Sequence, residues 1–138
     1  MKKIEQIAII GLGALGVMYA QRFIQSVGYQ KVVFLGDDKR IHRLQEAGIF
    51  CNQKKLDIQM INPEKDIFKA DLILFATKFG ALDDAIQLAQ KVVTSDTAIL
   101  SVLNGISSEA IIEEQLQNGK VIKCVAQGMD ALKINNQV

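Results

Sequence analysis

Three glycines near the start of the chain have the spacing of a phosphate-binding turn. Gly11 permits a sharp turn, Gly13 lets a pyrophosphate approach bare backbone, and Gly16 lets a helix pack closely on a strand. The N–H groups at the helix N-terminus and the positive end of its dipole then bind the anion. The pattern predicts a strand at 7–10, a helix at 17–27 and, between them, a dinucleotide-binding turn made of Gly11, Leu12, Gly13, Ala14, Leu15 and Gly16.

An acidic residue stands at the distance that such a turn requires. A second apolar run, 31–35, leads into Gly36, Asp37 and Asp38, which places Asp37 about 20 residues after the last glycine. A carboxylate at this point hydrogen-bonds the ribose of a bound dinucleotide. Glycine-rich turns also occur where the backbone merely needs a positive φ. The strand, the helix and the acidic residue together favour dinucleotide binding over that structural explanation.

Two more polar residues follow predicted buried strands. Lys78 comes after the apolar run 71–77, and Asn104 comes after the run 98–103. Because parallel strands end at one edge of a sheet, both should lie near the glycine turn and Asp37. Lys78 is suited to hold a phosphate or carboxylate, or it is a solvated loop lysine. Asn104 offers a donor and an acceptor to a ligand, or it belongs to an ordinary Asn-Gly turn.

Strands and helices alternate along the chain. The helix at 17–27 should end at Gly28, and a short polar helix within 37–48 should end at its glycine. From 49 to 61 the apolar period is two, which predicts an antiparallel β excursion with a turn at 52–55.

The second half continues the alternation. A helix carries Leu82, Ile86, Ala89 and Val93 on one face, and a later helix capped by Ser107 or Ser108 turns Ile112 and Leu116 inward. A last strand is predicted at 120–126. We therefore expect one α/β domain over 1–138, a Rossmann-type doubly wound and mostly parallel sheet with helices on both faces.

Composition excludes several classes of function. The 138 residues are 49% apolar, and 16 Lys and Arg nearly balance 15 Asp and Glu, so we expect no nucleic-acid or anionic-membrane partner. No apolar run reaches the roughly 18 residues of a membrane span, and no signal peptide is evident, which predicts a cytoplasmic protein. Cys51 and Cys124 lack metal-site spacing and are expected to be free thiols. His42 is expected to be a solvated side chain, and no metal is expected.

The sequence resembles the ketopantoate reductase (2-dehydropantoate 2-reductase) family. The glycine turn, Ala76-Thr77-Lys78, and Leu103-Asn104-Gly105 before a helix with Glu113-Glu114 occur in the family's order. The resemblance implies an oxidoreductase that reduces the 2-keto group of ketopantoate to pantoate with NADPH, a step toward pantothenate and coenzyme A. It also implies that residues 11–16 hold the pyrophosphate, that Lys78 contacts the cofactor, and that Asn104 lies between nicotinamide and substrate.

The chain departs from the family in two ways. Family members carry a basic residue after the second strand for the 2′-phosphate of NADP, whereas Asp37 stands there. A carboxylate suits NAD, although Lys39, Arg40 and Arg43 supply charge for a phosphate. NADP, which the family favours, and NAD therefore both stay open.

The second departure is length. The family's helical C-terminal domain, with the proton donor, most substrate contacts and a homodimer interface, would lie beyond Val138. We therefore expect the chain to supply the cofactor-binding half and to be inactive alone. The alternatives are a non-catalytic domain that senses nicotinamide nucleotides and, fitting less well, an S-adenosylmethionine-dependent methyltransferase.

Overall fold

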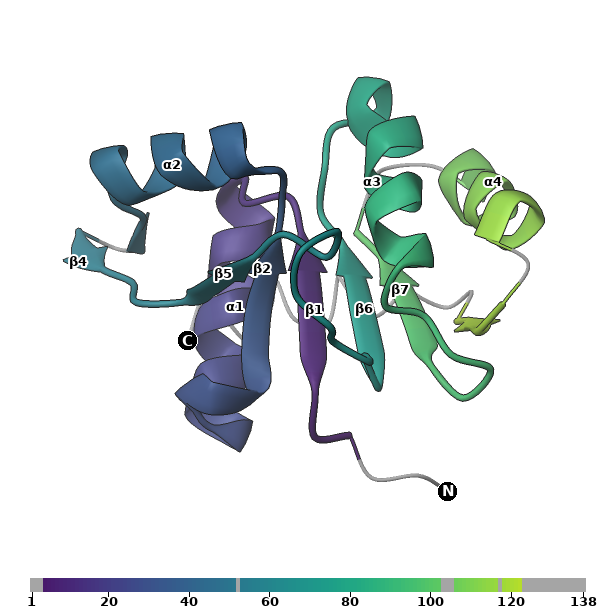
Figure 1. Cartoon of the computed structure of the whole chain (residues 1–138), viewed down its shortest axis with the longest axis horizontal. Helices are drawn as coiled ribbons and strands as arrows, with labels where there is room; N and C mark the ends of the chain where they lie inside the picture. Colours follow the sequence, from purple (N-terminus) through teal and green to yellow (C-terminus); the bar gives the residue numbers. More distant parts are fainter. Residues whose placement is uncertain (1–3, 52, 103–105, 117, 123–138) are drawn as a thin grey trace.

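The computed structural model describes residues 4–51, 53–102, 106–116 and 118–122 (Figure 1). Within these residues, six strands form one parallel sheet in the order β5-β2-β1-β6-β7-β8. The strands are β1 (Ile7–Ile10), β2 (Val32–Leu35), β5 (Gln59–Ile61), β6 (Leu72–Phe75), β7 (Ala98–Ser101) and β8 (Lys120–Val121). The chain builds outward from β1 to β2 and β5, then returns to β6 on the other side. This order confirms the Rossmann-type sheet, and its switch point lies between β1 and β6.

The three central strands are apolar throughout, which is why they occupy the middle of the sheet. Every residue of β1, β2 and β6 is buried. A strand whose two faces are both covered by helices needs a continuous apolar run rather than an alternating one. The register pairs Ile7 with Val32 on one side and with Leu72 on the other. The strand ends that follow these runs are thereby brought to one edge.

Helices cover both faces of the sheet. They are α1 (Ala14–Val27), α2 (Asp38–Ala47), α3 (Leu82–Gln90) and α4 (Ile106–Leu116), with short 3₁₀ turns at Tyr29–Lys31 and Phe79–Ala81. The side chains of Val17 and Ala20 from α1 pack with Ile9 and Phe34 on one face. Residues of α3 and α4 pack on the other face, with Ala8, Ile10, Val33, Ile73 and Phe75. Helices α1, α3 and α4 thus each bury apolar side chains against the sheet, whereas no residue of α2 is fully buried.

The β excursion after α2 is only partly as predicted. A short antiparallel hairpin does form between β3 (Phe50–Cys51) and β4 (Lys54–Lys55). The prediction is wrong for β5, which pairs in parallel with β2 and extends the main sheet, with Met60 opposite Phe34. All three β5 residues are half-buried. An edge strand and a hairpin strand both alternate with a period of two, so the local pattern does not distinguish them.

The start of α4 also differs from expectation. The helix begins at Ile106, so Ser107 and Ser108 lie inside it and neither is its N-cap. Ser108 is fully buried, and its Oγ lies 3.3 Å from that of Ser101 at the end of β7. A buried hydroxyl needs a hydrogen-bond partner, which explains a serine inside the helix. The inward positions of Ile112 and Leu116 are confirmed.

Several other expectations concern the ends of elements. Helix α1 ends before Gly28, whose φ of 102° and hydrogen bond to Ile24 confirm it as the stop. The last strand is described only at Lys120–Val121, and the remainder of the predicted 120–126 run lies outside the described residues. In the part of the chain that the structure describes, no helix is long and apolar enough to cross a membrane.

Candidate functional site

Two glycines of the first turn are required by close backbone approach. Gly11 has a φ of +94°, and a Cβ there would lie 2.7 Å from the carbonyl carbon of Ala76. A Cβ on Gly16 would lie 2.3 Å from the carbonyl oxygen of Gly11 and 3.1 Å from the Ala76 Cβ. Real Cβ atoms do not sit this close to backbone, so only glycine fits. These contacts hold α1 against the first turn and against the loop after β6.

Gly13 differs from its neighbours because it faces open space. It is the N-cap of α1 with φ −72° and ψ −172°, and a Cβ there would meet no atom within 4 Å. In the described structure, no side chain caps this helix, and its first turn carries no acidic residue. The first N–H groups of α1 thus lack a protein side-chain acceptor at an exposed point beside the switch point. This is the geometry of an anion site at a helix N-terminus.

The carboxyl ends of four strands meet around one cavity of about 630 Å³. Ile10 ends β1, Asp37 follows β2, Asn62 follows β5 and Thr77 follows β6. Arg40, Glu64, Lys91 and residues of α3 also line it. In Figure 1, the arrowheads of β1 and β6 point to the same edge, where α2 and α3 begin. The structure therefore brings Asp37 and Arg40, which are neighbours at the start of α2, to the same cavity as Thr77, which lies much further along the chain.

Other predicted residues lie elsewhere. Lys78 is exposed and, like Lys39 and Arg43, is not among the residues that line this cavity. Gly13 opens onto a neighbouring groove of about 870 Å³ between α1 and the 48–51 segment. Asn104 lies outside the described residues.

Asp37 has a structural role that the sequence reasoning missed. It is the N-cap of α2, and its Oδ1 accepts a hydrogen bond of 2.7 Å from the backbone N–H of Arg40. The signal was present in the sequence, because an Asp directly before a polar helix is a typical N-cap. The cap fixes the carboxylate at the mouth of the cavity and orients the first turn of α2.

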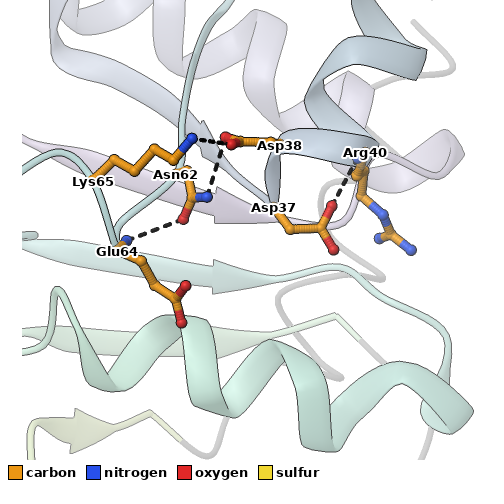
Figure 2. A network of polar contacts seen from close by, with 6 residues as sticks. All are labelled: Asp37, Asp38, Arg40, Asn62, Glu64 and Lys65. Atoms are coloured by element: carbon orange, nitrogen blue, oxygen red, sulfur yellow. Dashed lines mark hydrogen bonds and ion pairs between the residues drawn. The ribbon is translucent and has the colours of Figure 1, made fainter.

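A polar clamp beside the cap ties α2 to the loop after β5 (Figure 2). We use the name Asp38 clamp for Asp38, Asn62 and Lys65. Asn62 is buried; its Nδ2 donates to Asp38 Oδ1 at 3.2 Å, and its Oδ1 accepts from the Glu64 N–H at 3.0 Å. The Lys65 ammonium pairs with Asp38 Oδ2. These contacts hold the start of α2, and therefore Asp37, in a defined position relative to the sheet.

The Asp38 clamp changes the titration of its two charged groups. The hydrogen bond from Lys65, and then the one from Asn62, lower the pKa of Asp38 below its ordinary value of 3.8. The same pair raises the pKa of Lys65 above 10.5. A lowered carboxyl pKa adds stability that is lost as the pH falls through the folded value, and a raised ammonium pKa adds stability that is lost as the pH rises through it. The Asp38–Lys65 pair therefore contributes its full stabilisation of the fold between about pH 3.8 and 10.5.

We expect Lys65→Met to move the Asp38 pKa upward, toward its ordinary value, with part of the lowering retained through Asn62. The measurement is an NMR titration of the side-chain carboxyl of Asp38. The matched control is Lys69→Met, which removes the same charge from an exposed lysine four residues further along the chain. Equal shifts of the Asp38 pKa in both variants would mean that the Asp38–Lys65 contact does not set the pKa.

Thr77 contributes an unpaired hydroxyl to the same cavity. Among the described residues, its Oγ1 is buried and has no hydrogen-bond partner. Most buried polar groups are paired, so such an exception requires an explanation.

His42 and Cys51, in contrast, lie away from this cavity. His42 is exposed, as predicted, and its Nε2 contacts Glu46 at 3.1 Å, while Cys51 is a free thiol that donates to Gln21 Oε1 at 3.0 Å.

Comparison with solved structures finds similar domains in larger oxidoreductases. A 2-dehydropantoate 2-reductase from Geobacter metallireducens is 27% identical, with 79% of this chain and 37% of that chain covered and a TM-score of 0.60. D-mandelate dehydrogenase with NADH and anilino(oxo)acetate is 29% identical, with 79% and 36% covered and a TM-score of 0.64. A dimeric ketopantoate reductase from Staphylococcus aureus shares the fold at 23% identity, with 84% and 37% covered and a TM-score of 0.62.

The chain spans little more than a third of the length of these structures. No curated protein sequence matches it. A family model described as ketopantoate reductase PanE/ApbA matches residues 7–133, nearly the whole chain. With its Rossmann-type sheet and its glycine turn, the chain belongs to the ketopantoate reductase PanE/ApbA family.

Proposed function

We propose that this chain binds a nicotinamide dinucleotide at the carboxyl edge of its sheet and forms the cofactor-binding half of a reductase for small 2-keto acids. The observation that carries the proposal is the N-terminus of α1, where Gly13 leaves open space and no side chain of the described residues caps the helix. Family membership supports the reaction class. The NADH in the related D-mandelate dehydrogenase structure supports the cofactor class.

The residues at this edge fit a dinucleotide. The first N–H groups of α1 would bind the pyrophosphate, because no protein carboxylate of the described first turn competes for them. Asp37 would accept a hydrogen bond from a ribose hydroxyl at the mouth of the cavity. The unpaired Thr77 hydroxyl provides one more polar group in that cavity. Lys78 and Asn104 remain proposed cofactor contacts, and Asn104 a proposed substrate contact, on the family resemblance alone.

The bound cofactor would supply a hydride to the carbonyl carbon of the substrate. The contribution of this chain would be to hold the dinucleotide in one orientation, which converts a bimolecular encounter into a positioned one. For the whole protein we propose the reduction of ketopantoate to pantoate, and a homodimer, as in the Staphylococcus aureus relative. The proton donor to the substrate oxygen is not assigned among the described residues.

Calorimetric titration of the chain with NADH, NADPH and S-adenosylmethionine tests the cofactor proposal. We expect saturable binding of at least one nicotinamide dinucleotide and none of S-adenosylmethionine. The absence of heat with both dinucleotides, for a chain shown by circular dichroism to be folded, would refute the proposal. Binding of S-adenosylmethionine alone would instead favour the methyltransferase alternative.

A further inference from the structure

The cavity at the ends of β1, β2, β5 and β6 has more acidic than basic side chains. Among the described residues that line it, Asp37, Glu64 and Asp84 are acidic, and Arg40 and Lys91 are basic. At neutral pH this balance is negative. A dinucleotide with a free 2′-hydroxyl brings a hydrogen-bond donor to such a cavity, whereas a 2′-phosphate brings up to two more negative charges.

Asp37 is the carboxylate whose position is best defined. Its Oδ1 is held by the N–H of Arg40, and the Asp38 clamp anchors the adjoining residue to the loop after β5. In the described structure, Asp37 Oδ2 has no hydrogen bond, so it keeps full capacity to accept one from a ligand. A ribose hydroxyl donates to such an oxygen without disturbing the cap.

Arg40 does not make the cavity favourable for a 2′-phosphate. Its side chain is exposed, and in Figure 2 its guanidinium lies on the same side of the α2 N-terminus as the Asp37 carboxylate. A 2′-phosphate placed against Arg40 would therefore also approach Asp37. Lys65, a further cation at this end of α2, is engaged by Asp38, and Lys39 in the first turn of α2 does not line the cavity. An exposed, unanchored guanidinium costs side-chain entropy to fix, whereas the carboxylate is already held in place.

We propose that Asp37 determines the cofactor preference of this chain, and that the chain selects NAD(H) over NADP(H). This inference rests on the proposed binding of a nicotinamide dinucleotide and names which of the two forms the site accepts. Asp37 accepts the 2′-hydroxyl of the adenosine ribose and repels a phosphate at the same place. The Asp38 clamp acts as a positioning device, because it holds the N-cap that presents Asp37.

The test compares dissociation constants for NADH and NADPH in wild type, Asp37→Asn and Asp37→Ser. Asn and Ser cap helices as Asp does, so α2 is retained while the charge is removed. We expect wild type to bind NADH at least about tenfold more tightly than NADPH. In Asp37→Asn, NADH should weaken by roughly fivefold and NADPH should strengthen, so that the preference narrows or reverses.

The dependence of the two dissociation constants on salt concentration is a second measurement. If Asp37 had only a structural role, replacing it would not alter this dependence. If the Asp37 carboxylate repels the 2′-phosphate, a higher salt concentration screens this repulsion. The ratio of the NADPH to the NADH dissociation constant of wild type should then become smaller. In Asp37→Asn this decrease should disappear. The charge control is Asp96→Asn, which removes a carboxylate just before β7, at the opposite edge of the sheet, and should leave the preference unchanged.

The outcomes separate this inference from the proposed function. Binding of NADPH as tightly as NADH by wild type would overturn the inference and leave dinucleotide binding supported. A preference for NADH that is unchanged in both Asp37 variants would also overturn it. Binding of neither dinucleotide by folded wild type would overturn both proposals. Thermal unfolding of each variant confirms that a change in affinity does not come from loss of the fold.

Discussion

Gly13→Asp should abolish dinucleotide binding while slightly stabilising the fold. The side chain would enter the open space at the N-terminus of α1, and its carboxylate would take the N–H groups that the pyrophosphate needs. Each charge-assisted hydrogen bond lost costs about 1.5–3 kcal/mol, so loss of two weakens binding by at least about 100-fold. Asp is also a better N-cap than Gly, by a few tenths of a kcal/mol. Calorimetric titration and thermal unfolding measure the two effects.

Gly13→Ser is the matched variant, because a serine caps the same helix without a charge. Affinity should fall in the order Gly, Ser, Asp, while the unfolding temperature stays equal or rises in that order. Opposite trends in binding and stability distinguish competition for the N–H groups from damage to the fold. Retention of wild-type affinity in Gly13→Asp would show that the pyrophosphate does not bind at the N-terminus of α1.

Gly16→Ala should destabilise the fold, although alanine is the better helix former. In a helix interior, Ala is favoured over Gly by about 1 kcal/mol. Here the new Cβ would lie 2.3 Å from the carbonyl oxygen of Gly11, which is backbone and cannot move to another rotamer. The free-energy cost of forcing α1 away from the turn exceeds the gain in helix propensity, because overpacking of this kind costs about 1–3 kcal/mol or more. The free energy of unfolding in urea measures the loss.

Gly80→Ala is the control for Gly16→Ala. A Cβ on Gly80 would meet no atom within 4 Å, and the residue has no positive φ. Its free energy of unfolding should therefore change by less than about 0.5 kcal/mol. A similar small effect for Gly16→Ala would mean that α1 shifts without cost and that the close packing of the helix on the turn is not required.

The parts that could be predicted from sequence are those that depend on short stretches of chain. The apolar runs of β1, β2 and β6 predict strands buried on both faces, and the glycine turn predicts the helix that follows, although α1 begins at Ala14, inside the turn, and not at 17. Gly28 and Gly48 end their helices because a residue with positive φ is needed there. Each of these signals lies within a few residues of the element that it determines.

The prediction is weaker where a long-range contact decides the outcome. The segment at β5 alternates as a hairpin strand does, yet it pairs with β2 because the edge of the main sheet offers it a partner. Ser108 is buried in α4 rather than capping it, since Ser101 from β7 lies within 3.3 Å. Local periodicity carries no information about which distant segment supplies the partner.

The sequence by itself determined the fold class, the family and the edge of the sheet where a ligand should bind. Only the tertiary structure decided what each polar residue does at that edge. The sequence predicts Asp37 as a ribose contact, but its role as the N-cap of α2 depends on where that helix begins. The Asp38 clamp joins α2 to the loop after β5, whose residues are more than twenty positions away along the chain. Such contacts arise because parallel strands bring their carboxyl ends together, whatever their separation in sequence.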